Sequence, residues 1–287
     1  MVKVNQMAVL QVATITLVVL GSLVQVAKAV NAWDVTTWTP SHATFYGDDS
    51  GAATMGTPLS ETDQVITFCS FQLEWGGACG YGNLWWRGYG LATAALSDTL
   101  LNNGLTCGAC FEIKCNITGG ESGKWCIQSN PSIKITATNQ CPPNFDRPTD
   151  NGGWCNPPRT HFDLSLNMFR RLAQTQAGII PISYRRTRCI KTGGIRFYLG
   201  GNAHFNLVLV YNVGGWGDVM KMQMRGTKTG WITMKRNWGQ NWESSINYTG
   251  QSLSFIVTLG NGQVRVIRNL TPTVWYFKQT YEADTNF

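Results

Sequence analysis

The chain has 287 residues, of which 43% are hydrophobic and 14% are charged, with a net charge of +7. This hydrophobic content is enough to build packed cores, while the modest positive charge disfavours nucleic acid as a partner. This positive charge either serves ordinary solubility or gives a weak preference for polyanionic surfaces, and it marks no specific partner.

The first 29 residues predict a secretory signal peptide. Lys3 precedes an apolar run over residues 7–24, and Ala27-Lys28-Ala29 has the small-x-small pattern of a cleavage site. No later segment approaches the roughly 20 apolar residues of a membrane span, so we expect a secreted protein with no integral membrane segment. The rest of the chain exceeds a typical domain of roughly 100–150 residues, which predicts two domains.

Nine cysteines, all before residue 190, mark a compositional boundary and indicate disulfide bonds in an exported chain. Because nine is odd, one thiol is surplus. A zinc site at Cys107-Gly-Ala-Cys110 is disfavoured by the oxidising compartment and by the presence of only three histidines. We expect no metal and no other cofactor. The cysteines are Cys69, Cys79, Cys107, Cys110, Cys115, Cys126, Cys141, Cys155 and Cys189.

The first predicted strand is Ala43-Thr44-Phe45-Tyr46, which runs into a turn at residues 47–51. Thr44 and Tyr46 would share one face of it. Residues 76–82 hold too many glycines for regular structure, so they predict a tight loop. Trp85 and Trp86 follow this loop, where large aromatic side chains are either buried plugs or a surface for the apolar face of a ligand.

Short strands dominate the rest of the first half. Residues 93–101 predict a short helix that ends at Asn103-Gly104. Alternating apolar residues predict strands over 111–115 and 133–137, and residues 180–186 predict a further strand. Cysteines at the ends of these elements are typical of a small β-rich barrel that disulfide bonds stabilise.

Apolar residues at helical spacing after Asp163, from Leu164 through Met168 and Leu172, predict a helix that begins at Asp163 and ends at Gly178. An aspartate at that position is either an N-cap, worth about 1 kcal/mol, or a functional carboxyl group. Glycoside hydrolysis usually needs two carboxylates roughly 5–10 Å apart. The chemistry therefore depends on whether Asp163 has a partner.

The second half changes character after a linker at residues 191–194. Regularly spaced strands without a helix pattern predict a β-sandwich, with strands over residues 195–199, 205–213, 219–224, 230–234, 252–258 and 264–267. Five tryptophans are too many for so small a core, so we expect some of them to be exposed as sugar-binding faces. They are Trp216, Trp231, Trp238, Trp242 and Trp275. Possible glycosylation sites are Asn116, Asn247 and Asn269.

Over residues 41–287 the chain closely resembles the plant α-expansins. The resemblance implies a six-stranded double-psi β-barrel similar to family-45 endoglucanases over residues 41–190. It implies an immunoglobulin-like β-sandwich that binds cellulose over residues 195–287. The matching segments are His42-Ala-Thr-Phe-Tyr-Gly47, Gly77-Ala-Cys-Gly-Tyr-Gly-Asn83, residues 102–115, Gly152-Gly-Trp-Cys-Asn-Pro-Pro158, His161-Phe-Asp163, Tyr184-Arg-Arg186 and Arg236-Asn-Trp-Gly-Gln-Asn-Trp242.

The resemblance also assigns residue roles. It places the retained acid of the glucanases at Asp163, in the segment that starts at His161, and adds Thr44 and Tyr46. The glucanase base has no counterpart in the family, and a lone acid cannot activate the attacking water. The expected function is therefore non-hydrolytic loosening of the plant cell wall under acidic conditions, by a monomer that separates cellulose from matrix glycans such as xyloglucan. Substrate binding would fall to Trp238, Phe205 and Trp242, and, as departures from the family pattern, to Trp85 and Trp86.

Eight cysteines match the family, which implies the pairs Cys79–Cys107, Cys110–Cys189, Cys115–Cys126 and Cys141–Cys155. Cys69 is left over in residues 57–76, which the family pattern lacks and which are either a retained intron or a genuine loop. Glu74 in this stretch offers a carboxylate, so a weak endoglucanase is one alternative. A carbohydrate-binding or defence protein without loosening activity is another, although the tryptophan-rich second half argues against it.

Overall fold

The computed structural model describes residues 36–47 and 77–287. The predicted signal peptide, the stretch 57–76 with Cys69, and Glu74 lie outside the described residues. The elements below all belong to one compact unit, Trp38–Phe287. No helix in the described part of the chain is long and apolar enough to cross a membrane.

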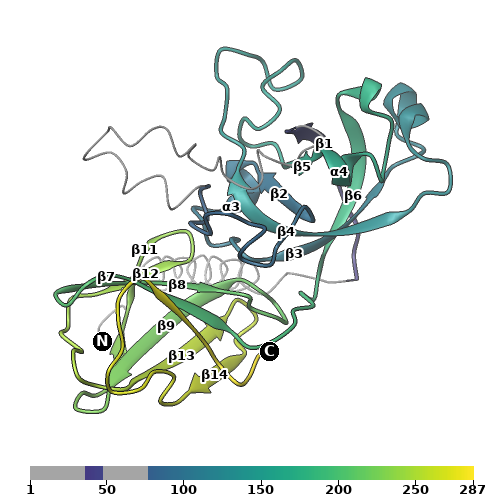
Figure 1. The fold of residues 1–287 in the computed structure, drawn as a ribbon. Helices are drawn as coiled ribbons and strands as arrows, with labels where there is room; N and C mark the ends of the chain where they lie inside the picture. Colours follow the sequence, from purple (N-terminus) through teal and green to yellow (C-terminus); the bar gives the residue numbers. More distant parts are fainter. Residues whose placement is uncertain (1–35, 48–76) are drawn as a thin grey trace, which may run out of the picture. The chain divides into compact units, whose positions relative to one another are not determined.

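Six strands in the first half form a closed barrel in the order β1-β5-β2-β4-β3-β6 (Figure 1). Strand β6 closes it by pairing antiparallel with both β1 and β3. The barrel is filled by aromatic rings, since Phe111, Phe162 and Tyr184 contact one another with centroids 4.8–6.0 Å apart. The strands are β1 (Thr39–Tyr46), β2 (Thr93–Leu96), β3 (Cys110–Cys115), β4 (Ser132–Gln140), β5 (His161–Ser165) and β6 (Ile180–Thr187).

The structure confirms the predicted strands of the barrel and all four disulfide pairs. The bonds join Cys79 to Cys107, Cys110 to Cys189, Cys115 to Cys126 and Cys141 to Cys155. Strands β2, β3 and β5 are short, and long connections separate several barrel strands, so covalent links hold the connections against the barrel. The connections also hold the short 3-10 helices η2 (Gly120–Trp125) and η3 (Thr175–Ala177).

Both helix predictions in this half were wrong in the same way. Residues 93–96 form the fully buried strand β2, and the helix α3 covers only Asp98–Leu101. Asp163 lies inside β5 because Phe162 and Leu164 fill the barrel core, and the helix α4 (Leu166–Phe169) begins only after Ser165. Asp163 is therefore not a helix N-cap. Pairing and burial in the barrel outweigh local helix periodicity at both places.

The second half is the predicted β-sandwich of two antiparallel sheets, with strand orders β10-β9-β13-β14 and β11-β12-β8-β7-β15 (Figure 1). Strands were expected at six of these nine positions, whereas β11, β12 and β15 were not foreseen. The bounds are β7 (Arg196–Asn202), β8 (Phe205–Tyr211), β9 (Val219–Gly226), β10 (Ile232–Thr233), β11 (Lys235–Trp238), β12 (Asn241–Ser244), β13 (Leu253–Leu259), β14 (Val264–Ile267) and β15 (Gln279–Glu282).

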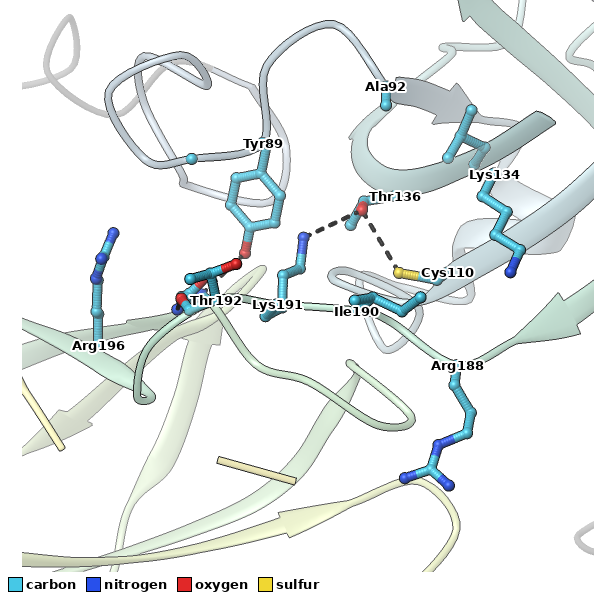
Figure 2. Close-up of a pocket in the computed structure, with 13 residues that line it drawn as sticks. Tyr89, Ala92, Cys110, Lys134, Thr136, Arg188, Ile190, Lys191, Thr192 and Arg196 are labelled. Carbon is cyan, nitrogen blue, oxygen red and sulfur yellow. Dashed lines mark hydrogen bonds between the residues drawn. The ribbon is translucent and has the colours of Figure 1, made fainter. Parts of the chain in front are cut away.

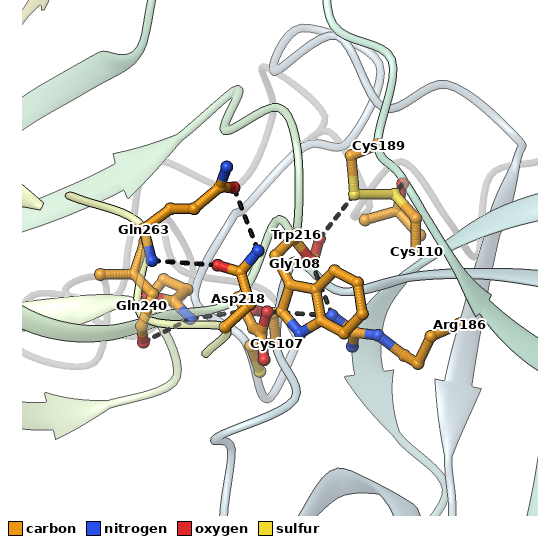
Figure 3. A network of polar contacts seen from close by, with 12 residues as sticks. Cys107, Gly108, Cys110, Arg186, Cys189, Trp216, Asp218, Gln240 and Gln263 are labelled. Carbon is orange, nitrogen blue, oxygen red and sulfur yellow. Dashed lines mark hydrogen bonds and ion pairs between the residues drawn. A yellow bond between two sulfur atoms is a disulfide. The ribbon is translucent and has the colours of Figure 1, made fainter. Parts of the chain in front are cut away.

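A buried ion pair links the barrel to the sandwich. Arg186 at the end of β6 donates from Nη2 to Asp218 Oδ1 at 2.9 Å and to the backbone carbonyl of Trp216 at 2.7 Å (Figure 3). Its guanidinium group lies over Phe111 of the barrel at 5.1 Å and over Trp216 at 4.8 Å, measured to the ring centroids. Trp216 therefore serves this junction rather than an open sugar-binding face.

Close backbone contacts reinforce the same junction. Gln240 donates from Nε2 to the carbonyl of Cys107 at 2.8 Å, which joins the sandwich to the first disulfide bond (Figure 3). Gly108 has a φ of +88°, and a Cβ atom there would lie 2.7 Å from the carbonyl oxygen of Gly217. Only glycine allows that conformation and that approach. In addition, Leu209 and Tyr211 of β8 belong to the apolar cluster of the barrel core.

Candidate functional site

Parallel pairing of β1 with β5 brings three polar side chains of the candidate site together. The register sets His42 opposite His161 and Thr44 opposite Asp163. Thr44 Oγ1 donates a hydrogen bond to Asp163 Oδ1 at 2.7 Å and lies 2.9 Å from His161 Nε2. The structure thus connects Asp163, Thr44 and His161 in one chain of hydrogen bonds.

The direction of these hydrogen bonds follows from the number of protons. A threonine hydroxyl has one hydrogen, and Thr44 uses it to donate the hydrogen bond to Asp163. In the second contact the Thr44 oxygen must therefore be the acceptor, and His161 donates to it from Nε2. Burial lowers the pKa of His161 to about 3, with the nearby Arg159 and His42 adding to the effect, so the ring is neutral. Its Nδ1 atom is buried and has no hydrogen-bond partner among the described residues.

Asp163 is half-buried and therefore reachable by a ligand. Burial raises the pKa of its carboxyl group above the usual value, although the hydrogen bond from Thr44 opposes the shift. The protonated form, which can donate a hydrogen bond, therefore persists to a higher pH than for an exposed aspartate. Tyr46 shares the face of Thr44 on β1, and burial raises its pKa as well, so its phenol also remains a donor.

Two other carboxyl groups of the barrel half have hydrogen-bond partners of their own. Glu112 accepts hydrogen bonds from Arg185 at 2.7 and 2.9 Å, and Asp98 accepts one from Gln140 at 2.5 Å. Within residues 36–47 and 77–287, no hydrogen bond joins Asp163 to a second carboxyl group. The arrangement can hold one proton at the Asp163 carboxyl group and donate it in a hydrogen bond.

The two adjacent tryptophans lie on the surface, in the loop that leads to β2. Trp85 is 59% and Trp86 79% exposed, which favours the ligand-facing alternative over core plugs. Asn83 Oδ1 accepts hydrogen bonds from both of their backbone N–H groups at 3.0 and 3.1 Å, which fixes the turn. The same loop ends near Asp163, because Ser165 donates its hydroxyl to the carbonyl of Leu91 at 2.6 Å.

Two family models match the chain, one described as lytic transglycolase over residues 93–184 and one as the Expansin C-terminal domain over residues 195–272. Expansin-A22 of Arabidopsis thaliana is 50% identical over 252 residues, covering 88% of this chain and 80% of that protein. Expansin-A13 of Oryza sativa subsp. japonica is 41% identical over 276 residues, covering 96% and 97% respectively. The chain belongs to the plant expansins.

Solved structures support the fold of this expansin. The crystal structure of the apo-expansin of Clavibacter michiganensis has a TM-score of 0.60, at 17% identity, and covers 87% of this chain and 98% of that one. A variant of that protein in complex with cellohexaose matches with the same TM-score at 16% identity. Together with the family models, these matches confirm the predicted double-psi β-barrel and β-sandwich.

The candidate aromatic residues of the sandwich divide between the two faces of one sheet. Trp238 pairs with Asn241, which in turn pairs with Leu209 of β8, so these three side chains lie on one face of the sheet. Phe205 lies on the same face as Leu209, because the two are four residues apart on β8, and it is 41% exposed. Trp242 pairs with Val208 and points into the sandwich core, where only 3% of it is exposed. The expectation that Trp242 binds a glycan was therefore wrong, because its ring has no accessible face.

Sequence reasoning missed one concave feature altogether. A pocket of about 430 Å³ lies where β3 and β4 of the barrel meet residues 188–192 and the start of β7 (Figure 2). Its lining comes from several separate segments, so no local motif could have pointed to it. No group of three or more His, Cys, Asp or Glu side chains that could hold a metal ion gathers among the described residues.

Proposed function

We propose that this expansin loosens plant cell walls under acidic conditions without hydrolysing glycans. The observation that carries the proposal is the carboxyl group of Asp163, which accepts its hydrogen bond from the Thr44 hydroxyl and makes none with a second carboxyl group of the described residues. Membership of the expansin family supports the same conclusion, as does the solved complex of a bacterial expansin with cellohexaose.

In the proposed mechanism, protonated Asp163 donates a hydrogen bond to a glycan oxygen. This bond replaces one that the glycan made to a neighbouring chain, so contacts between cellulose and matrix glycans are exchanged and no covalent bond breaks. Hydrolysis would need a base to activate water, in addition to the acid. Thr44 and His161 position the carboxyl group, and the Tyr46 phenol is a second donor on the same face.

Two aromatic surfaces would hold the polysaccharide. Trp85 and Trp86 present exposed rings in the loop before β2, while Phe205 and Trp238 share the outer face of the sandwich sheet. An aromatic ring stacks on the apolar face of a sugar, and the sugar hydroxyl groups stay in contact with water. The proposal therefore assigns cellulose and a matrix glycan such as xyloglucan as partners, in the cell wall, for a secreted monomer.

The decisive experiment measures extension of heat-inactivated plant walls under constant load, with release of reducing sugars followed in parallel. Full-length mature protein should increase creep in acidic buffer without releasing sugar. Sugar release that disappears in the variant Glu74→Gln would instead support the endoglucanase alternative. If the protein binds cellulose but causes neither creep nor sugar release, it is a carbohydrate-binding protein without loosening activity, and the proposed function is wrong.

A further inference from the structure

The pocket beside the linker is lined by cationic side chains. Lys134 comes from β4, Arg188 and Lys191 from the segment after β6, and Arg196 from β7 (Figure 2). Its volume of about 430 Å³ lies within the range of small-molecule sites. It shares no lining residue with the site around Asp163.

The positive charge of this pocket is only partly compensated by acidic side chains. No acidic side chain lines it. Arg196 pairs with Glu282 at 3.0 Å, and Lys134 lies opposite Glu112 in the β3–β4 register, whereas Arg188 and Lys191 form no ion pair with any described residue. Lys134 and Arg188 are exposed, so water screens their charges. Lys191 is the member of the group whose charge is shielded from water.

Lys191 lacks the partners that a desolvated ammonium group requires. Its Nζ atom lies 3.5 Å from the hydroxyl of Thr136 and 4.3 Å from the ring centroid of Tyr89 (Figure 2). An ammonium group carries three N–H donors, and these two neighbours satisfy only part of that capacity. Burial lowers the pKa of Lys191 to about 8, which reflects the missing counter-charge.

We propose that this pocket binds the carboxylate of an acidic sugar unit, such as a uronate of a matrix polysaccharide. The carboxylate would accept hydrogen bonds from Lys191, with Lys134 and Arg188 adding long-range attraction at the exposed side. Ile190 is 83% exposed beside them and offers an apolar surface for the sugar ring. The choice of a wall polysaccharide as the source of the carboxylate rests on the proposed function.

Binding should be measured by titration calorimetry on the full mature chain at about pH 5.5 and low salt, where Lys191 is charged. The probes are a short oligogalacturonate, a neutral cello-oligosaccharide of equal length, and inorganic phosphate. The oligogalacturonate should bind, and Lys191→Gln should weaken that binding about tenfold, as expected for loss of a charged hydrogen bond. The matched control is Lys228→Gln, which removes the same charge from an exposed position between β9 and β10 and should leave affinity within about twofold.

Three results would overturn the inference. Equal losses in the two variants would indicate general charge attraction. Phosphate binding without oligogalacturonate binding would indicate a site for small inorganic anions. An unchanged affinity in Lys191→Gln would exclude this pocket. If Lys191→Gln does not fold, the double variant Lys134→Gln/Arg188→Gln, which changes only exposed side chains, carries the test and should also weaken binding. Titration involves no wall extension, so it fails or succeeds independently of the creep experiment.

Discussion

Asp163 is a carboxyl group whose useful form, in the proposed mechanism, is the protonated one. We therefore predict that Asp163→Asn retains wall-loosening activity at neutral pH, because an asparagine amide donates a hydrogen bond at any pH. Creep induced by the variant should change less than about twofold from acidic to neutral pH, whereas the parent protein should lose activity as the pH rises through the raised pKa of Asp163. Asparagine also keeps an oxygen that can accept the hydrogen bond from Thr44.

The pH dependence of the stability of Asp163→Asn tests whether the variant folds, independently of its wall-loosening activity. Since burial raises the pKa of Asp163, the folded state holds its proton more tightly than the unfolded state does. This group therefore favours folding increasingly as pH falls from the folded-state pKa toward about 4. The thermal unfolding midpoint of Asp163→Asn should therefore rise less, as the pH is lowered over this range, than that of the parent protein. A folded variant that is inactive at every pH would contradict the hydrogen-bond-donor role.

At the scale of elements, the β1–β5 pair determines how Asp163 titrates. The hydroxyl of Thr44 lowers the pKa of Asp163, so Thr44→Val should raise that pKa further and extend wall loosening to higher pH. The variant also leaves the buried Nε2–H of His161 without its acceptor, which should cost about 1–3 kcal/mol of stability. The checks are creep against pH and thermal unfolding.

Ser41→Ala is the matched control for Thr44→Val. Ser41 lies on the same strand, and its hydroxyl donates to the backbone carbonyl of Thr160 at 2.8 Å, not to the site. This control should leave the pH profile of creep unchanged. A profile for Thr44→Val that shifts to lower pH, or does not shift, would show that the hydroxyl does not act through the Asp163 carboxyl group.

The elements also show where sequence reasoning succeeds and where it fails. Alternation within single strands predicted β1, β3, β4 and β6, and the family motifs predicted four disulfide pairs that spacing alone leaves among 105 combinations. Asp163 was placed on a helix because Leu164, Met168 and Leu172 fit a helical period, although Leu164 belongs to the barrel wall. Helical spacing in a window that spans a strand and a short helix is misleading.

The binding role expected of Trp242 fails for a different reason: no strand was expected at β12, and only the pairing of β12 with β8 sets Trp242 opposite inward-facing Val208. The neighbouring β11–β12 register also shifts between Arg236 and Trp238, so that Trp238 faces outward. Such an irregularity reverses the side chains that follow it and leaves no mark in local composition. The cationic pocket was missed because only tertiary structure brings its segments together.

For the molecule as a whole, we expect the ion pair of Arg186 with Asp218 to make the barrel and the sandwich unfold together. Both side chains are nearly inaccessible, so removing one partner leaves a buried charge without compensation. Arg186→Met should therefore destabilise the protein by about 3–5 kcal/mol. Because Arg186 contacts Trp216 and Asp218 of the sandwich from the end of a barrel strand, the variant should also replace a single cooperative transition by two.

A double-mutant cycle distinguishes coupling from simple loss of packing. In Arg186→Met/Asp218→Leu neither charge remains, so much of the penalty of the single variant should be recovered. The matched surface control is Lys235→Met, which breaks the exposed pair with Glu243 at 3.4 Å and should change stability by less than about 1 kcal/mol. Additive losses in the cycle, with one transition in every variant, would mean that the ion pair does not couple the two halves. A large coupling energy would mean instead that barrel and sandwich form one cooperative unit. A polysaccharide could then bind both proposed glycan surfaces without first having to fix the two halves relative to each other.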